Sequence, residues 1–299
     1  YAIGDIHGCE ESLRALVKKI NPSPKDTLWF CGDIVNRGPS SLDCIRFIKS
    51  LKNKIVCVLG NHDIYLLAIA SGVIKPPKNN ESLNQVLNSK DNDEIINWLR
   101  FLPLMHIENK TILVHAGLLP NWEPIQIYKL ANKISSNLKS HYWKEFLFEL
   151  WGNSPGLWTN KLKGAQRNTL VVNGLTRIRF LKSNGEMDFT NKLSPKENKM
   201  NLFPWFLFPN RLSKDYKVIF GHWSSLGLII RPNLISLDTG CVWGGMLTAV
   251  RVEDNKIYWD VNRYEYDKTI TSKRLEERKP PFYINLKNTI KFASIRNDL

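Results

Sequence analysis

Residues 27–38 of this 299-residue chain read Thr-Leu-Trp-Phe-Cys-Gly-Asp-Ile-Val-Asn-Arg-Gly, an apolar run that ends in a Gly-Asp pair. An uninterrupted run of branched and aromatic side chains is typical of a buried strand. Shortly afterwards an apolar residue recurs at helical spacing, at Leu42, Ile45, Ile48 and Leu51. A buried strand, a glycine turn and an amphipathic helix in this order favour a layered α/β domain.

The same rhythm extends in both directions from this stretch. Residues 55–59 and 111–114 are further apolar, branched runs that predict buried strands. Upstream of residue 27, a helix with one apolar face is expected, because apolar residues recur at helical spacing at Leu13, Leu16, Val17 and Ile20. The first 120 residues therefore alternate strands with helices.

The rhythm changes twice farther along the chain. Between about residues 121 and 210 the strand pattern stops, and helices are expected at 125–138 and 142–150. Strands resume with an alternation that suits antiparallel pairing, at 217–220, 234–237, 246–252 and 256–259. We therefore predict an α/β core of residues 1–120 and 211–265, a mainly helical inserted cap at 121–210, and a C-terminal tail at 266–299 that prolines interrupt.

The composition is that of a globular protein with a sizeable core. Hydrophobic residues make up 43% and charged residues 23% of the chain. The longest apolar runs are far shorter than the roughly 20 residues that cross a bilayer, so no membrane partner is expected. No secretory signal is visible, and five cysteines without paired spacing indicate reduced thiols and a cytoplasmic location. Because Tyr1 stands almost inside the first motif, further natural residues are expected upstream of it.

The net charge of +14 leaves one alternative open. An excess of 42 Lys and Arg over 28 Asp and Glu is able to steer a polyanion to the protein or to support nucleic-acid binding. The lysines are spread along the whole chain, which favours compositional drift over a basic patch. A nucleic-acid-binding protein with degenerate metal motifs would show strong, salt-dependent duplex binding without hydrolysis.

Metal-type side chains follow five of the apolar runs. The motifs are Gly4-Asp5-Ile6-His7-Gly8, Gly32-Asp33, Gly60-Asn61-His62-Asp63, His115 and Gly221-His222. A single Gly-Asp pair is usually a turn, but four of the six histidines occur in these motifs, where α/β sheets present their ligand-binding loops. Carboxylate, amide and imidazole ligands together suit Mn²⁺, Fe, Co²⁺ or Zn²⁺ better than Mg²⁺ or Ca²⁺.

In content and order these motifs resemble those of the calcineurin-like metallophosphoesterases. The resemblance implies a β-sandwich flanked by helices and two divalent metal ions, with Mn²⁺ as the first choice and Co²⁺ or Fe as alternatives. It also implies a ligand set in which Asp33 bridges both metals. Asp5 and His7 would bind the first metal, and Asn61, His115 and His222 would complete the second.

The resemblance suggests catalytic roles for three more residues. His62 is the expected general acid for the leaving oxygen, and Asp63 is expected to orient it. Alternatively, His62 only binds phosphate. Arg37, four residues after Asp33, offers a bidentate fork for phosphate oxygens, whereas the alternative is an ordinary surface arginine.

Two residues differ from those of one large group within this superfamily and so narrow the choice of family. Protein serine/threonine phosphatases of this superfamily carry Asp where this chain has Asn36, and Glu where it has Asp63. With the segments 97–100, 176–180, 220–223 and 237–245, these residues resemble the symmetrical bis(5'-nucleosyl)-tetraphosphatases over roughly residues 1–263. That family implies cleavage of diadenosine tetraphosphate into two ADP by a hydroxide that bridges the metals. A protein phosphatase or an enzyme that removes nucleoside-polyphosphate caps from RNA remains the alternative, and no obligatory protein partner is evident.

Three residues are candidates for holding the rest of a dinucleoside polyphosphate. Arg177 and Arg179 share one face if their stretch is extended, and they could bind the phosphate chain or instead pair with acidic residues. Trp243 stands in a glycine-rich loop after the last metal motif, where its ring would suit stacking of adenine. Packing in the core is the alternative for any such aromatic residue.

Overall fold

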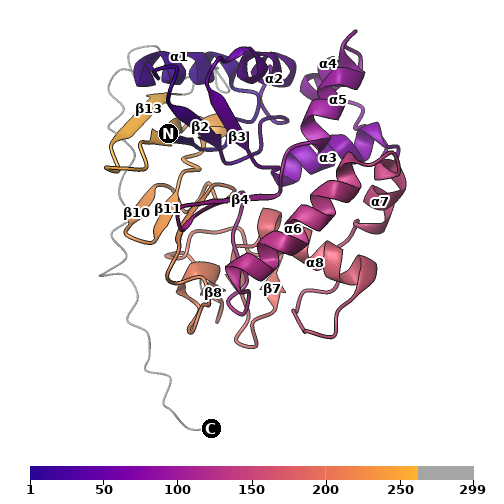
Figure 1. The fold of residues 1–299 in the computed structure, drawn as a ribbon, viewed down its shortest axis with the longest axis vertical. Coiled ribbons are helices and arrows are strands. Elements are labelled where there is room, and N and C mark those ends of the chain that lie inside the picture. Colours follow the sequence, from indigo (N-terminus) through magenta and orange to yellow (C-terminus); the bar gives the residue numbers. More distant parts are fainter. Residues whose placement is uncertain (199, 262–299) are drawn as a thin grey trace.

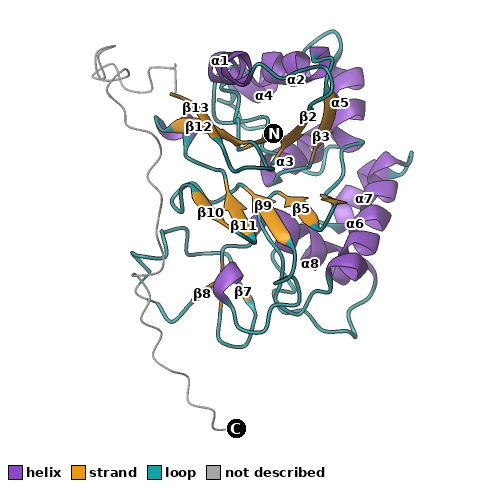
Figure 2. Ribbon diagram, turned by 60° about the vertical axis from the view of Figure 1, so that its left-hand side comes forward, coloured by secondary structure: helices purple, strands orange, loops and turns teal. Residues whose placement is uncertain are grey.

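The computed structural model describes residues 1–198 and 200–261, so the expected tail at 266–299 lies outside the described residues (Figure 1). Two five-stranded sheets lie face to face, and helices cover the outer side of each (Figure 2). This arrangement confirms the predicted layered α/β class, a β-sandwich flanked by helices. Within the described ranges, no helix has both the length and the apolar character needed to cross a membrane.

The first sheet is built around three parallel strands. Its order is β13-β12-β1-β2-β3. The bounds are β13 (Ile257–Val261), β12 (Met246–Val250), β1 (Ala2–Ile3), β2 (Thr27–Phe30) and β3 (Lys54–Cys57). The strands β1, β2 and β3 run parallel, whereas β12 pairs antiparallel with both β1 and β13. The carboxyl ends of β1 to β3 therefore share one edge.

The second sheet repeats this plan with three other parallel strands. Its order is β10-β11-β9-β5-β4. The bounds are β10 (Ile229–Arg231), β11 (Leu234–Ser236), β9 (Lys217–Phe220), β5 (Thr111–Val114) and β4 (Met105–Glu108). The expected antiparallel pairing is wrong for β9, which runs parallel to both β5 and β11. A central strand with both neighbours parallel is buried, and burial rather than alternation governs its sequence.

Helices α1 (Glu10–Ile20) and α2 (Ser41–Ser50) cover the outer face of the first sheet (Figure 1). In α1 the apolar residues expected on one face are all buried. Acidic residues occupy its first turn and lysines its last, which complements the helix dipole. The helix packs against β12 and β13, where Lys19 forms an ion pair with Asp260.

The remaining helices lie toward one side of the sandwich (Figure 2). Their bounds are α3 (Asn61–Ala70), α4 (Glu81–Leu87), α5 (Asn92–Arg100), α6 (Pro124–Lys139), α7 (Trp143–Glu149) and α8 (Gly164–Arg177). Residues 121–210 contain α6 to α8 and a small sheet of order β7-β6-β8, with β6 (Phe180–Leu181), β7 (Met187–Asp188) and β8 (Phe203–Pro204). Since α6 packs against β4, this segment adjoins the second sheet directly. We propose it as the inserted cap.

A separate apolar layer fills the space between the two sheets. It joins Ala2, Trp29 and Val58 of the first sheet and its loops to Leu113 and Ile219 of the second, together with further buried neighbours. Close packing of these side chains fixes the sheets relative to each other. Consequently the loops at the carboxyl ends of both sets of parallel strands are held in fixed relative positions.

Candidate metal centre

The predicted metal-type residues occupy the loops at these strand ends. Asp5 follows β1, Asp33 follows β2, and Asn61 begins α3 after β3, while His115 and His222 follow β5 and β9. The backbones of His7, Asp33 and His222 have positive φ angles of 48°, 48° and 64°. Non-glycine residues adopt this conformation at a cost, and such strain concentrates at functional sites.

Two glycines allow these loops to approach one another. A Cβ atom on Gly60 would clash with the carboxylate of Asp33, and one on Gly221 would clash with the carboxylate of Asp5. Neither glycine has a positive φ, so the close approach of the carboxylates, and not a backbone conformation, requires a residue without a side chain here.

Ligand atoms of five residues form two groups that share one carboxylate. In each group the atoms lie within 4.8 Å of one another; the first is His7, Asp33 and His62, and the second is Asp33, His115 and His222. A carboxylate has two oxygens and is able to serve two ions at once. The structure thus brings Asp33 to the centre of the predicted ligand set.

Hydrogen bonds to the backbone orient the imidazole of His115. Its Nδ1 lies 2.7 Å from the carbonyl oxygen of Cys31, which only accepts, so Nδ1 carries the proton. In the neutral ring, Nε2 then presents a lone pair 3.3 Å from Asp33 Oδ2 and 3.1 Å from Asn61 Oδ1. Three electron-rich atoms that face one another repel unless a proton or a metal ion lies between them. This donor set therefore fits a divalent metal ion.

The pKa values of the residues around Asp33 show that its carboxylate is stabilised by positive charge. Burial would raise the pKa of Asp33, but His115, His62 and His7 hold it well below its usual value. Burial acts to lower the pKa of His115, but the charge of Asp33 and the hydrogen bonds to Asp33 and to the Cys31 carbonyl together raise it. Burial and then Arg179 keep the pKa of His222 well below its usual value, so its ring is neutral and competent to bind metal.

Asp5 lies next to these groups but belongs to neither. Its Oδ2 accepts a hydrogen bond of 2.9 Å from the backbone of His222, whereas Oδ1 is buried and has no hydrogen-bond partner among the described residues. Burial, followed by the charges of Asp238 and Asp33, raises its pKa well above the usual value. A buried carboxylate oxygen without a partner is costly, and a nearby cation would remove that cost.

Asp238 is a buried carboxylate at the site that the sequence analysis did not single out. It follows β11, lines the same cavity as Asp33 and His222, and interacts electrostatically with Asp5 and His7. The rule that selected the other residues, an Asp directly after an apolar strand, would also have selected Asp238.

The carboxylate of Asp63 is bound to the backbone of three residues. Its carboxylate accepts from the backbone of Gly60, Asp33 and Ile34 at 2.9, 2.8 and 3.0 Å, and among the described residues it forms no hydrogen bond with His62. Asp63 therefore fastens the Asp33 loop to the start of α3, and its role in orienting His62 stays a prediction.

Asn36 takes the place beside His62 instead. The Oδ1 of Asn36 accepts from the backbone of Arg37 and the amide of Asn80, both at 2.8 Å, so its Nδ2 faces His62 Nδ1 at 2.8 Å. An amide nitrogen only donates, which leaves Nδ1 without a proton and puts the proton of the neutral ring on Nε2. Burial, with His7 and Arg37 also opposing a positive charge, lowers the pKa of His62 to about 4 despite the attraction of Asp33.

The three candidate arginines all line one cavity of about 490 Å³, with His7, Asp33, Asn61, His62 and His222 also in its wall. Arg37 has its guanidinium 5.5 Å from the ring centroid of Trp243, a tryptophan that is 61% exposed. Arg179 donates to the carbonyl oxygen of His222 at 3.2 Å. The cavity therefore combines the candidate metal ligands with groups that bind phosphate.

The condition of an extended segment is not met at Arg177, which is the last residue of α8. Its guanidinium donates to the side-chain oxygens of Asn153 and Asn173 at 2.7 and 3.0 Å. Neither Arg177 nor Arg179 forms a salt bridge within the described ranges. A change of direction after the helix nevertheless brings both guanidinium groups to the cavity.

Comparisons with known proteins agree with this geometry. The model of the calcineurin-like phosphoesterase family matches residues 1–179. A symmetrical bis(5'-nucleosyl)-tetraphosphatase of Aromatoleum aromaticum is 48% identical over 86% of this chain and 95% of its own length. One from Nitrosospira multiformis is 44% identical over 86% and 94%. Both alignments extend over 259 residues.

A solved structure shows the same fold. The crystal structure of a candidate diadenosine tetraphosphatase superposes with a TM-score of 0.57 at 24% identity, over 87% of this chain and 91% of that one. Membership of the metallophosphoesterases implies divalent metal ions, and the two groups of ligand atoms described above fit them. The chain belongs to the calcineurin-like phosphoesterases and, within them, to the family of symmetrical bis(5'-nucleosyl)-tetraphosphatases.

Proposed function

We propose that this chain hydrolyses diadenosine tetraphosphate symmetrically and releases two molecules of ADP. The observation that carries the proposal is the pair of ligand groups joined by Asp33, set in a cavity with three arginines. Relatives that are 42–48% identical and named symmetrical bis(5'-nucleosyl)-tetraphosphatase support the choice of substrate. A dinucleoside polyphosphate is thus the expected partner of this cavity.

Two divalent ions complete the proposed site. Asp5 and His7 would hold the first, Asp33 would bridge both, and the second would be held by Asn61, His115 and His222. The mixture of carboxylate, amide and imidazole favours Mn²⁺, with Co²⁺ or Fe as alternatives. When bound, the ions supply an activated water and positive charge for the phosphoryl oxygens.

The other side chains act on the phosphate chain and the departing ADP. Arg37, Arg177 and Arg179 bind phosphoryl oxygens and orient the substrate. Because Asn36 leaves the proton of neutral His62 on Nε2, His62 donates a hydrogen bond from that atom to a phosphoryl oxygen. This role replaces the expected transfer of a proton from a charged imidazole.

Neutral His62 suits an anhydride better than a phosphate monoester. The leaving group of the proposed reaction is a phosphate oxygen of ADP, whose pKa of about 6 makes it stable without a proton. A phosphatase that acts on serine or threonine expels a far more basic alkoxide and needs a proton donor. The amide of Asn36 therefore disfavours the alternative of a protein phosphatase, and no described residue specifically favours an RNA cap.

Analysis of products tests the proposal. The purified protein would be incubated with diadenosine tetraphosphate and Mn²⁺ or Co²⁺, and the nucleotides would be separated by ion-exchange chromatography. ADP alone is expected. Equal amounts of AMP and ATP would reject symmetrical cleavage, and an unchanged substrate would reject the proposed function.

All five cysteines, which lie within the described ranges, are free and buried. Their reduced state is typical of the cytoplasm, which we propose as the location of the protein.

A further inference from the structure

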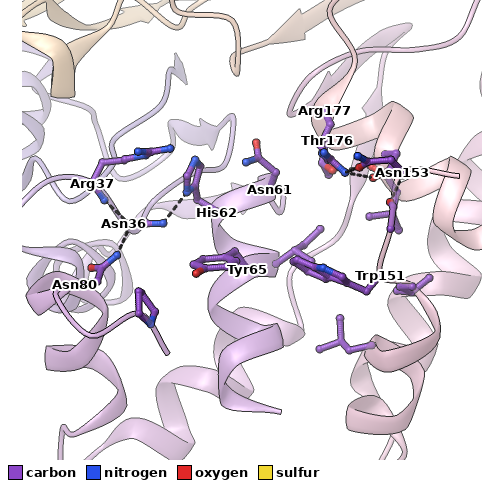
Figure 3. A pocket seen from close by; sticks show the side chains of 17 residues that line it. Asn36, Arg37, Asn61, His62, Tyr65, Asn80, Trp151, Asn153, Thr176 and Arg177 are labelled. Carbon is purple, nitrogen blue, oxygen red and sulfur yellow. Dashed lines mark hydrogen bonds between the residues drawn. The ribbon is translucent and has the colours of Figure 1, made fainter. Parts of the chain in front are cut away.

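A second cavity, of about 500 Å³, adjoins the metal cavity (Figure 3). The two cavities share Arg37, Asn61, His62 and Arg177 in their walls. A volume of this size is typical of small-molecule sites. Because its neighbour is the proposed reaction site, a molecule bound here would lie directly beside the reacting phosphates.

Two aromatic rings line one part of the second cavity. Tyr65 lies one turn after Asn61 on α3, and Trp151 follows α7 in the cap; their rings are side by side in Figure 3. The centroids are 6.5 Å apart and the planes are inclined by 39°. If a base lay between the two rings, the ring planes would have to be roughly 7 Å apart, which is twice the contact distance between carbon atoms. The two rings therefore form one aromatic platform on which a base stacks, and not a slot that encloses it.

The surroundings of the platform are apolar on one side. Ile64, Leu147, Leu150 and Val172 line the cavity and are almost fully buried. Trp151 itself is 49% exposed, although a large aromatic ring in water is a costly feature that a stacked ligand would offset.

Polar groups connect the cavity to the catalytic residues. Asn80 donates to Asn36, which in turn donates to His62. On the opposite side in Figure 3, Asn153 accepts a hydrogen bond from Arg177. The cavity thus presents an aromatic platform, amide groups suited to hydroxyls or ring nitrogens, and two arginines at its border with the metal cavity.

We propose that this second cavity binds one nucleoside of the substrate, with its purine stacked on Tyr65 and Trp151. The phosphates extend between Arg37 and Arg177 toward Asp33, and the other nucleoside lies on the side of Trp243, which lines only the metal cavity. The inference rests on the proposed function and adds to it a residue pair that selects nucleotides over other polyphosphates. Since Tyr65 belongs to the core and Trp151 to the cap, the nucleoside contacts both.

The kinetic test compares substrates with and without a nucleoside. In Trp151→Ala and Tyr65→Leu, the ratio of kcat/KM for diadenosine tetraphosphate to that for inorganic tripolyphosphate is expected to fall roughly 5- to 150-fold, the range of one stacking interaction. Phe148 also belongs to this part of the cap, but its side chain is 73% exposed and does not line the cavity. As the control, Phe148→Ala should leave the ratio unchanged. Equal ratios in all proteins would overturn the inference.

A binding measurement separates this inference from the proposed function. ADP would be titrated into the metal-free full chain by calorimetry, with no turnover involved. Weaker binding in Trp151→Ala and Tyr65→Leu, but not in Phe148→Ala, would support the nucleoside site even if diadenosine tetraphosphate were not hydrolysed. ADP affinity that neither replacement changes would refute the site, whether or not the wild-type protein hydrolyses the dinucleotide.

Discussion

At the scale of single residues, the contact between Asn36 and His62 decides which chemistry the centre favours. Burial lowers the pKa of His62, and an amide donor beside Nδ1 also favours the neutral imidazole, whereas a carboxylate at the same position would accept a hydrogen bond from the charged ring and stabilise it. Whether residue 36 presents an amide nitrogen or a carboxylate oxygen therefore decides whether His62 acts as a neutral hydrogen-bond donor or as a general acid.

Replacing Asn36 with Asp is expected to improve the hydrolysis of alkyl phosphate monoesters. With a proton on His62, the ratio of kcat/KM for glycerol phosphate to that for diadenosine tetraphosphate should rise about 10²-fold, a typical contribution of general acid catalysis. The control is Asn88→Asp, which adds the same charge at the exposed end of α4. A ratio that does not change would show that residue 36 does not control the proton on His62.

His62→Asn tests whether His62 touches substrate or metal, since its imidazole belongs to the first group of ligand atoms. If His62 donates a hydrogen bond to a phosphoryl oxygen, kcat should fall about 10²-fold while two metal ions per chain remain, measured by atomic emission. His106→Asn, on the edge strand β4, serves as the control. Loss of a metal ion in the His62 variant would make it a ligand.

At the scale of elements, the loops at the strand ends bring the metal-binding side chains together. The loop after β9 approaches Asp5 closely only because it has a glycine, Gly221, at that point. Gly221→Ala places a Cβ against Asp5 and should reduce the metal content below two ions per chain. Gly227→Ala is the matched control, because nothing lies near its Cβ and its φ of +72° costs only about 1–2 kcal/mol of backbone strain. If both variants keep their metal, Asp5 is not essential for binding it.

The elements also show how far a sequence pattern reaches. Apolar runs followed by Asp, His or Gly-Asn-His predicted the strand ends, because the chemistry is local to each loop. The parallel partners of β9 were missed, since pairing depends on strands that are distant in the sequence. The short strands β4 and β10 were missed as well, and so was the contact of Tyr65 with Trp151, which depends on how the segment after α7 packs near α3.

At the scale of the whole molecule, the centre joins two sheets that also pack against each other through an apolar layer. The second group of ligand atoms takes Asp33 from the loop after β2 and His115 and His222 from the other sheet. An ion bound there connects both halves of the sandwich. Metal binding should therefore stabilise the fold and not only the site.

Removal of metal is expected to lower the melting temperature. Four carboxylates, those of Asp5, Asp33, Asp63 and Asp238, are buried together, and metal ions offset their repulsion. An ion present at 100 times its Kd adds about 2.7 kcal/mol, which corresponds to a shift of roughly 5–10 °C for a domain of this size. Calorimetry with chelator, and again after Mn²⁺ is restored, measures the shift. An unchanged melting temperature would contradict the proposed centre.

The two groups of ligand atoms also differ in when the ribosome completes them. His7, Asp33 and His62 all lie in the first 62 residues, whereas the second group is complete only when His222 has been made. At about 5–20 residues per second, that difference amounts to roughly 8–32 s of synthesis. A nascent chain therefore carries every side chain of the first group well before the second group exists, although β12, the antiparallel partner of β1, is made only after His222.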